Sequence, residues 1–473
     1  MLSADIISRL EAIVGREHCR RGVLDLELYS YDSSPFFHPP ELVIFPGTAE
    51  EAAAVMALAR RENLPLVARG AGTSLSGGAV PWKGGLILAT GRMNRVLNLD
   101  FLEETVLVEC GVVNLDLQNY LAKHGYMFPP DPASQKSATL GGNIAENAGG
   151  IKGVKYGITK HHVLGLEILM DDGRLTRTGR LAAPEEAAGP DLSGLFLASE
   201  GTLGLVTKAL LKITPLPESY RTVSAVFDDL EKSGRAVSEI IAAGIIPTAM
   251  EILDHNLVVA LEDYLHLGFP REAEAVLLIE VDGLGPELDR QMDRIMAICR
   301  QAGASSLSSA NTAEERDKLW LARRSGNGAM GRIKPALICQ DVTVPVNKLP
   351  AMLSLVQDVA RRHDIIIVQI AHAGDGNLHP HLLYTPGDEP EYARAMEASH
   401  DIFLAAIEAG GTLTGEHGIG LEKVAFMDRQ FTEDELAFMA GIKNALDPEG
   451  RLNAGKILPE RCLEKAGAAG VNE

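Results

Sequence analysis

Glycine-rich segments, each joined to a strand, are concentrated in the first half of this chain and limit the folds that it can adopt. Four clusters are present, at Gly70–Gly78, Ser137–Asn143, Asn147–Gly150 and Ser199–Gly204. Glycine allows positive φ angles and lets backbone N–H groups approach a ligand closely. Four such clusters in one region predict a domain that holds a large phosphate-bearing cofactor, whereas any one of them alone would also fit a tight turn.

The first cluster follows an expected strand, and consecutive amides in Gly70–Ser74 can form a nest for a phosphate. It is not the dinucleotide-binding fingerprint, because Leu75 stands where G-x-G-x-x-G requires its third glycine. It also lacks the Gly-Lys-Ser/Thr of a Walker loop. The segment therefore predicts a phosphate-binding loop that belongs to neither of these two common motifs.

A β-α-β unit precedes this cluster. Leu42–Phe45 and Leu64–Arg69 are expected to be strands, with a helix over Ala49–Glu62 between them. Thr48 and Glu51 are expected to form a capping box at the start of that helix. The unit indicates a fold in which helices pack on a sheet.

A second domain is expected after Pro215–Pro217, because 473 residues are too many for one compact core. Helices such as Asp229–Ala243 and Glu287–Gly303 alternate there with strands such as Ala275–Val281 and Ile365–Ala371. The whole chain is therefore expected to be an α+β protein of two main domains.

Two short segments of the second half have the residues of a reactive site. His372–His381 reads H-A-G-D-G-N-L-H-P-H, and Thr414–Gly420 reads T-G-E-H-G-I-G. The first is expected to be a loop that leaves the end of a strand, so that its three histidines lie in glycine-rich turns. The second places a glutamate and a histidine side by side in another such turn.

The donor types in these segments match a metal site. His372, His379 and Glu416 form a ligand set for a divalent metal that keeps open positions for substrate. His417 stands where a general base would meet a metal-bound molecule. The alternative is structural: each histidine could be hydrogen-bonded in the interior, with Asp375 making an Asx turn.

The composition excludes several classes of partner. Lys and Arg total 44 and Asp and Glu total 64, which gives a formal net charge of −20. Nucleic acids and anionic membrane surfaces require a basic face, so neither is an expected partner. No apolar run reaches the length of a membrane span, and the N-terminal residues do not resemble a signal peptide.

The five cysteines are scattered along the chain without a C-x-x-C spacing. This arrangement argues against an iron–sulfur cluster held within the chain and against a disulfide framework. A reducing compartment is expected, with the cytoplasm as the default and attachment to a membrane through a partner as the alternative.

Taken together, these motifs resemble the FAD-linked oxidase family of the vanillyl-alcohol oxidase and p-cresol methylhydroxylase superfamily. The resemblance is based on Arg69–Gly78, Pro130–Asp131, Ser137–Gly150, Ser199–Gly204 and the two histidine segments, and it extends over residues 31–457. Within the superfamily the chain is similar to the glycolate oxidase flavin subunit and to D-lactate and D-2-hydroxyglutarate dehydrogenases. The resemblance implies an FAD-binding domain of two subdomains and a C-terminal substrate domain with an antiparallel sheet and terminal helices.

The resemblance also implies the FAD-binding residues, and it implies non-covalent FAD because Gly70–Gly78 contains no His or Cys. The diphosphate loop would be Arg69, Gly70, Gly72, Thr73, Ser74 and Gly77. The residues lining the diphosphate and the flavin would be Pro130, Asp131, Ser137, Thr139, Gly142, Asn143, Ala145 and Gly149. The adenosine side would be formed by Glu200, Gly201 and Val206, and Asn453 would close over the flavin.

In the same family the two histidine segments bind a divalent metal and substrate. The resemblance assigns His372, His379 and Glu416 as ligands of zinc, iron or manganese, and His417 as the base that takes the hydroxyl proton. Arg323 resembles the arginine that binds the substrate carboxylate, with the adjacent Arg324 as the alternative. His381 would be a second substrate contact or a solvent-facing residue.

Position 339 bears on the size of the substrate. Relatives whose substrate has a second carboxylate have a lysine near this position, whereas Cys339 stands here, and Lys334 would need a shifted register to replace it. The departure favours D-lactate or glycolate over D-2-hydroxyglutarate.

The expected organisation is an FAD-binding domain over residues 1–217, a substrate and metal domain over 218–457 and a tail over 458–473. Helices from about residue 421 are expected to pack back on the FAD-binding domain. The expected reaction is FAD-dependent oxidation of a small D-2-hydroxy acid to a 2-oxo acid. Electrons would pass to an electron-transfer flavoprotein, an iron–sulfur subunit or a quinone, and the chain would form a homodimer or a hetero-complex.

Four alternatives remain open from the sequence. The chain could oxidise D-2-hydroxyglutarate, or it could be a flavin subunit that is active only within a glycolate oxidase complex. A metal-dependent hydrolase would use the same histidines with water, and its glycine clusters would be mere turns. A non-catalytic FAD-binding subunit is the fourth possibility.

Overall fold

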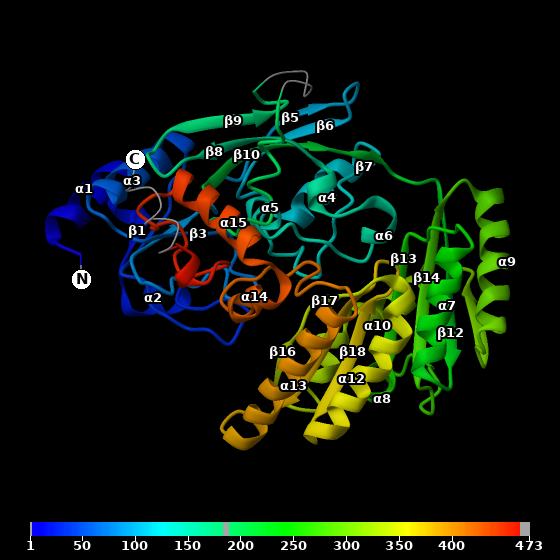
Figure 1. Ribbon diagram of the computed structural model, residues 1–473. Coiled ribbons are helices and arrows are strands. Elements are labelled where there is room, and N and C mark those ends of the chain that lie inside the picture. Colours follow the sequence, from blue (N-terminus) through cyan, green and yellow to red (C-terminus); the bar gives the residue numbers. More distant parts are fainter. Residues whose placement is uncertain (1, 183–188, 464–473) are drawn as a thin grey trace. The chain divides into compact units, whose positions relative to one another are not determined.

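The computed structural model describes residues 2–182 and 189–463 (Figure 1). Contacts divide the chain into two compact units. Unit 1 contains residues 1–148, 158–216 and 416–473, and unit 2 contains residues 149–157 and 217–415. Unit 2 thus includes a short segment from within the span expected for the FAD-binding domain. The part of the expected tail beyond residue 463 lies outside the described residues.

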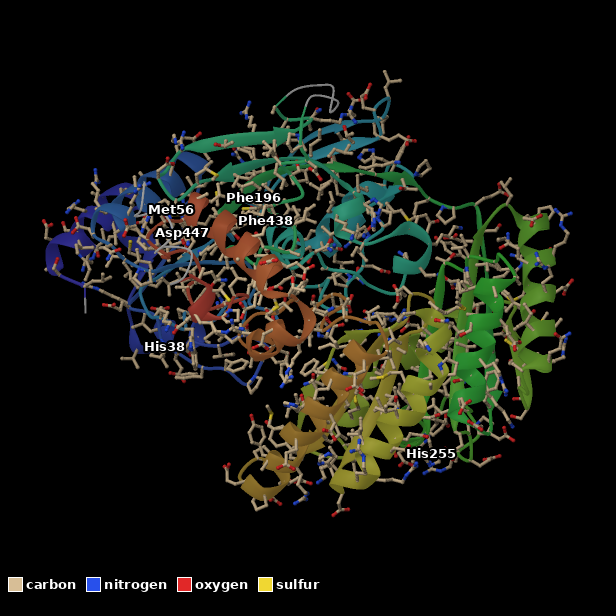
Figure 2. All side chains as sticks on the ribbon, in the orientation of Figure 1. His38, Met56, Phe196, His255, Phe438 and Asp447 are labelled. Carbon is tan, nitrogen blue, oxygen red and sulfur yellow. The ribbon has the colours of Figure 1, made fainter. Side chains whose placement is uncertain are left out.

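The first sheet of unit 1 contains the predicted β-α-β unit. Its strand order is β1-β2-β4-β3, and both β2 and β3 pair in parallel with β4. The bounds are β1 Cys19–Arg20, β2 Leu42–Ile44, β3 Leu66–Arg69 and β4 Leu86–Ala89, with helices α1 Ala4–Val14, α2 Val23–Leu28 and α3 Ala49–Arg61. Met56 of α3 lies in the apolar core that α1 and α3 form with this sheet (Figure 2).

The predicted capping box of α3 is only half present. Thr48 accepts a hydrogen bond from the amide of Glu51 at 3.1 Å, as expected. The Glu51 carboxylate, however, accepts from the amide of Gly47 at 2.7 Å and not from that of Thr48. The glutamate therefore fixes the turn one residue before the cap.

The second sheet of unit 1 is antiparallel, with the order β5-β6-β10-β8-β9. Its strands are β5 Val96–Asp100, β6 Thr105–Glu109, β8 Val163–Leu169, β9 Leu175–Gly179 and β10 Leu205–Lys212. Helices α4 and α5 share an apolar core with this sheet. The remaining elements of unit 1 are η1 Arg16–His18, α4 Asn114–Ala122, β7 Tyr126–Met127, α5 Leu140–Glu146, η2 Thr159–His161, β11 Thr214–Pro215, η4 Val424–Phe426, α14 Met427–Gln430 and α15 Glu433–Leu446.

Unit 2 is built on one antiparallel sheet with the strand order β15-β12-β14-β13-β18-β19-β16, and β17 also pairs with β19. The strands are β12 Ser219–Phe227, β13 Ala249–Asp254, β14 Ala275–Gly283, β15 Ser306–Ala310, β16 Ala336–Cys339, β17 Val342–Thr343, β18 Ile366–His372 and β19 Asn377–Tyr384. The helices are α6 Gly153–Tyr156, α7 Leu230–Ala242, α8 His255–Leu265, α9 Gly285–Gln301, α10 Ala313–Arg324, α11 Gly326–Met330, η3 Val346–Lys348, α12 Leu349–His363 and α13 Glu389–Glu408. An antiparallel sheet in the second domain is therefore confirmed.

The prediction that all three histidines lie in a loop is wrong. His372 is the last residue of β18, and both His379 and His381 lie within β19, so that only the turn between the strands is glycine-rich. The sequence obscured this strand because Pro380 lacks a backbone N–H and is unusual inside a sheet. Among the described residues, no helix is both long and apolar enough to cross a membrane.

Candidate functional site

The first glycine loop of unit 1 begins directly after β3. Gly72 and Gly77 have φ angles of +71° and +85°, which side chains rarely adopt. A Cβ atom on Gly70 would stand 2.2 Å from Thr139 Oγ1, and one on Gly72 would stand 2.1 Å from Arg69 Nη2. Close packing therefore requires glycine at position 70, and the backbone angle favours it at positions 72 and 77.

Helix α5 brings the second glycine cluster against the first. Thr139 caps the helix by accepting from the amide of Gly142 at 3.3 Å, and the same hydroxyl lies beside Gly70. The Asn143 side chain is 3% exposed, and its Nδ2 atom has no hydrogen-bond partner among the described residues. A buried amide without a partner is costly, so this position suits a polar ligand.

The other residues assigned to FAD are spread over several elements of unit 1. The carbonyl of Pro130 accepts from Asn114 Nδ2 at 3.1 Å, Asp131 is buried, and Ser137 is exposed. The carbonyl of Ala145 accepts from the amide of Glu200 at 2.9 Å, which joins helix α5 to the last cluster. Thr73, Ser74, Gly201 and Val206 also lie in unit 1, whereas Gly149 begins the segment that belongs to unit 2.

Glu200 is oriented toward the second histidine segment. Its carboxylate accepts from the amides of Ile419 and Gly420 at 2.7 and 2.9 Å, all within unit 1. Burial raises the pKa of Glu200 although these amides lower it, and burial together with Glu200 raises the pKa of Glu146 well above its usual value. This part of unit 1 is therefore a region of buried carboxyl groups in which the protonation of each group depends on the other.

Taken together, unit 1 fits FAD. Two glycines that tolerate no Cβ, a helix that begins beside them and a buried amide without a partner surround the first loop. Backbone amides and small residues of this kind are what a diphosphate requires.

Unit 2 places the histidines of the first segment on one face of its sheet. Directly opposed residues of antiparallel strands share a face, and so do residues two apart along one strand. Ile370 is opposite His379, and Glu251 of β13 is opposite His372. The rings of His372 and His379 meet edge to face with centroids 5.0 Å apart, and a nitrogen of each lies within 4.8 Å of the other. Two imidazoles are thus close enough to share one cation.

Glu251 connects His372 to Arg323. One carboxylate oxygen lies 2.6 Å from His372 Nδ1, and the other accepts from Arg323 Nε. Burial alone would raise the pKa of Glu251, but His372 and Arg323 hold it below its usual value. Arg324 points away, since it is exposed and donates to the carbonyl of Asp317 at 3.3 Å. Of the two arginines, Arg323 alone is tied to the histidine face.

Asp341 is the carboxylate beside His379, as Glu251 is beside His372. It is fully buried, and its oxygens accept from Asn377 Nδ2 at 2.6 Å and from the amide of Gly415 at 2.9 Å. His379 Nδ1 lies 3.9 Å from the same carboxylate. The residue after Gly415 is Glu416, so Asp341 fixes the end of the chain segment that leads to the predicted third ligand.

Cys339 lies opposite His381 in the pairing of β16 with β19. The Cys339 Sγ and His381 Nε2 atoms are 3.4 Å apart, and His381 is 4% exposed, so it does not face solvent. Lys334 cannot act in place of Cys339, because its ammonium is paired with Glu391 at the start of α13. This end of the face therefore has a thiol and an imidazole, whereas the amine of Lys334 is bound to Glu391.

His417 and Glu416 belong to unit 1. His417 Nε2 lies 3.7 Å from Glu416 Oε1, and the carbonyl of His417 accepts from Ser76 Oγ at 3.0 Å. The next residue, Gly418, has a φ of +83°. The backbone of the proposed base is thus anchored to the first glycine loop.

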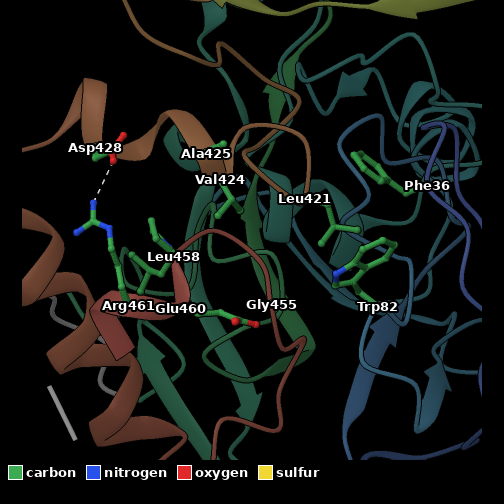
Figure 3. Close-up of a pocket in the computed structure, with 11 residues that line it drawn as sticks. Phe36, Trp82, Leu421, Val424, Ala425, Asp428, Gly455, Leu458, Glu460 and Arg461 are labelled. Carbon is green, nitrogen blue, oxygen red and sulfur yellow. Dashed lines mark hydrogen bonds and ion pairs between the residues drawn. The ribbon is translucent and has the colours of Figure 1, made fainter. Parts of the chain in front are cut away.

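Unit 1 also has a pocket of about 480 Å³ that contains none of the predicted site residues (Figure 3). Phe36 and Trp82 form one side of it, and Leu421, Val424 and Leu458 contribute apolar side chains. Asp428 and Arg461 form an ion pair of 3.1 Å at its edge. One side of the pocket is thus apolar and aromatic, and its edge is charged.

Sequence reasoning missed two side chains of the histidine face, Glu251 and Asp341. Both are buried carboxylates, and each lies beside a histidine that is distant from it in the sequence. Glu251 and His372, for example, are 121 positions apart. The available signal was a single glutamate in the apolar strand A-M-E-I-L-D. A charged residue in a fully buried strand needs a partner.

Comparisons with known proteins match both halves of the chain to described families. Residues 40–179 match the family described as FAD binding domain, and residues 216–457 match FAD linked oxidases, C-terminal domain. The chain is 40% identical over 458 residues to glycolate oxidase subunit GlcD of Bacillus subtilis (strain 168), with 97% of each chain covered. It is 32% identical to a probable mitochondrial D-lactate dehydrogenase of Danio rerio, with 96% of this chain and 91% of the relative covered.

A solved structure of p-cresol methylhydroxylase with substrate bound matches with a TM-score of 0.79 at 15% identity, covering 95% of both chains. At this identity the match concerns the fold alone. The fold class predicted from the sequence is confirmed.

Proposed function

Since this chain belongs to the FAD-linked oxidases and is an FAD-dependent oxidoreductase, we propose that it oxidises a small D-2-hydroxy acid, D-lactate or glycolate, to the 2-oxo acid. One observation carries the proposal. Arg323, at the end of α10, is linked through Glu251 to His372, which lies beside His379 on one face of the unit 2 sheet. A 2-hydroxy acid presents a carboxylate and a hydroxyl group to such a face.

The residues of this face have complementary roles. Arg323 uses Nε to hold Glu251, and its two terminal nitrogens are the pair that a carboxylate accepts from. His372, His379 and Glu416 are the proposed metal ligands. When bound there, a divalent metal would supply a Lewis acid for the substrate hydroxyl group, and FAD would supply the hydride acceptor. His417 takes the hydroxyl proton.

The carboxylates of Glu251 and Asp341, which lie beside the two histidines, support this assignment. Metal-binding histidines usually donate their other ring N–H to a carboxylate, which fixes the tautomer and the ring orientation. Glu251 stands at His372 Nδ1, which leaves Nε2 for a ligand. Asp341 lies beside His379 and holds Gly415, the neighbour of Glu416.

Cys339 and His381 favour a short substrate. A second carboxylate would need a cation at that end of the face, and the amine of Lys334 is paired with Glu391. D-2-hydroxyglutarate is therefore the less favoured alternative. Two relatives are named as subunits of glycolate oxidase, which makes action within a hetero-complex the other alternative.

No electron acceptor is fixed by the site. An electron-transfer flavoprotein, an iron–sulfur subunit or a quinone would serve, and an iron–sulfur relay would belong to another chain, because the five scattered cysteines contain no C-x-x-C. Such cysteines also fit a cytoplasmic location.

Anaerobic absorbance spectroscopy tests the proposed function. D-lactate, L-lactate, glycolate and D-2-hydroxyglutarate are added in turn to the purified, FAD-loaded protein. We expect D-lactate or glycolate to bleach the oxidised flavin band, and L-lactate to leave it unchanged. Bleaching by D-2-hydroxyglutarate alone would select the alternative substrate, and no bleaching by any acid in a metal-loaded sample would contradict the proposal.

The carboxylate clamp can be tested by exchanging one arginine for lysine. Arg323→Lys keeps a positive charge beside Glu251 but removes the planar pair of donors, so we expect the KM for the acid to rise about ten- to a hundredfold. Arg324→Lys is the matched control, because Arg324 is exposed and does not contact the histidine face. Steady-state kinetics that show the larger KM in the control would move the clamp to Arg324.

The role of Glu251 can be tested through metal affinity. Glu251→Gln keeps the shape of the side chain but removes the charge that orients His372, and we expect metal affinity to fall about ten- to a hundredfold. Competition with a chelator, followed by metal analysis, measures this. Glu280→Gln is the control, because Glu280 is buried on the same sheet and paired with Arg316 but contacts neither histidine. Equal losses in both variants would mean that Glu251 acts on the fold and not on the metal.

A further inference from the structure

Residues Arg451–Leu458, here called the C-terminal clasp, lie against the first glycine loop within unit 1. Leu452 forms a parallel bridge with Leu66 of β3, and the amide of Asn453 donates to the Leu66 carbonyl at 2.9 Å. The clasp therefore continues the first sheet beside the strand from which the glycine loop leaves. Gly455 of the clasp also lines the pocket that Phe36 and Trp82 border (Figure 3).

Two side chains of the clasp meet on a single carbonyl of the loop. Lys456 Nζ donates to the carbonyl of Gly78 at 2.7 Å, and Asn453 Nδ2 donates to the same oxygen at 2.9 Å. Lys456 also donates to Asn453 Oδ1 at 2.5 Å, so the two side chains orient each other. Lys456 is 4% exposed and Asn453 is 1% exposed.

The peptide that begins at this carbonyl is held on its other sides as well. The amide of Ala79 donates to Asp32 at 3.2 Å, and the carbonyl of Ala79 accepts from Arg69 at 3.3 Å. The amide of Gly78 donates to Ser74 Oγ at 3.1 Å, within the loop itself. The far end of the Gly70–Gly78 loop is therefore fixed by side chains, whereas its near end is fixed by β3.

Burying an ammonium group is unfavourable. Removing a charge from water costs several kcal/mol unless interactions with its partners offset this penalty. Burial lowers the pKa of Lys456 to about 7, although Glu200, Asp32 and Glu146 act to raise it. The hydrogen bonds of Lys456 Nζ go to the Gly78 carbonyl and to Asn453 Oδ1, so this side chain holds the loop directly and also orients the second residue that holds it.

We propose that Lys456 is a positioning residue for FAD: its ammonium, together with the Asn453 amide, fixes the Gly78 carbonyl and so holds the Gly70–Gly78 loop in the conformation that receives the diphosphate. The proposal rests on FAD binding by this chain and is independent of which acid is oxidised. The backbone amides of the loop face the ligand only if its ends stay in place. Lys456 acts through the loop and need not touch FAD.

The test is FAD affinity in Lys456→Met, measured on the full-length apoprotein by titration with FAD and flavin fluorescence. We expect the Kd for FAD to rise about ten- to a hundredfold, the factor that a charge-assisted hydrogen bond contributes. Lys456→Gln keeps a donor for the Gly78 carbonyl and should recover part of this affinity. The rate of FAD release from the holoenzyme should be highest in Lys456→Met, lower in Lys456→Gln and lowest in the parent.

Arg451→Met is the matched control. Arg451 is 3% exposed and lies in the clasp itself, but its guanidinium pairs with Asp171 and not with the Gly70–Gly78 loop. Thermal unfolding of the apoproteins measures the purely structural part, which both variants should share. An FAD Kd within about threefold of the parent in Lys456→Met, or an equal loss in the control, would overturn the proposal. If the methionine variant does not fold, FAD release from Lys456→Gln at the parent rate would overturn it.

Discussion

Replacing His417 by alanine is expected to slow anaerobic reduction of the flavin by substrate about 10²- to 10⁴-fold, the range that a positioned general base contributes. The reason is that the hydroxyl proton must leave as hydride leaves C2, and the imidazole of His417 is the proposed acceptor. Metal content, FAD content and substrate binding are expected to stay close to those of the parent. Stopped-flow absorbance with saturating D-lactate or glycolate measures the rate.

The anchors around His417 make this substitution a clean test. Ser76 Oγ donates to the His417 carbonyl, and Glu200 accepts from the amides of Ile419 and Gly420. All of these bonds involve backbone groups of the second histidine segment, which alanine retains. The segment is therefore expected to keep its conformation when the imidazole is removed.

A second histidine variant separates loss of the base from a general effect of the substitution. His124→Ala is the control, since His124 is exposed in unit 1 and lies beside the rings of Phe101 and Tyr120. A parent-like rate in His417→Ala would exclude His417 as the base.

Local signals in the sequence were enough to predict much of unit 1. The strand Leu66–Arg69, the glycine loop after it and the helix at Ala49–Arg61 follow from hydrophobic patterning, a cap residue and a cluster of glycines. Each of these signals acts over a few residues. The same is true of the helix that Asp229 caps in unit 2, where its side chain accepts from the amide of Glu231.

The errors and omissions occurred where the deciding contacts are long-range. Pro380 and its polar neighbours do not look like a strand until β18 and β16 pair with them on both sides. The segment 149–157 belongs to unit 2 because Tyr156 donates to Asp282 at 2.8 Å, across 126 positions of the chain. No pattern within a few residues reveals such a partner, because the two residues come together only in the folded chain.

Replacing His379 by alanine is expected to remove the divalent metal and to reduce turnover about 10³-fold or more, because a metal that polarises the reacting oxygen contributes several kcal/mol. FAD is expected to stay bound, since every loop assigned to it except Gly149 belongs to unit 1, whereas His379 lies in β19 of unit 2. Elemental analysis relative to flavin absorbance measures the metal, and steady-state kinetics measure turnover.

The neighbours of His379 sharpen the interpretation of this variant. Asn377 keeps its hydrogen bond to Asp341, and Asp341 keeps Gly415, so the chain that leads to Glu416 should not move. His363→Ala is the control, because His363 also lies in unit 2 but pairs with Asp401 on the helices. A His379→Ala protein with normal metal content and turnover would remove the metal from the site and leave the histidine face with a structural role. Loss of metal with unchanged flavin reduction would instead show that the metal is bound there but takes no part in the reaction.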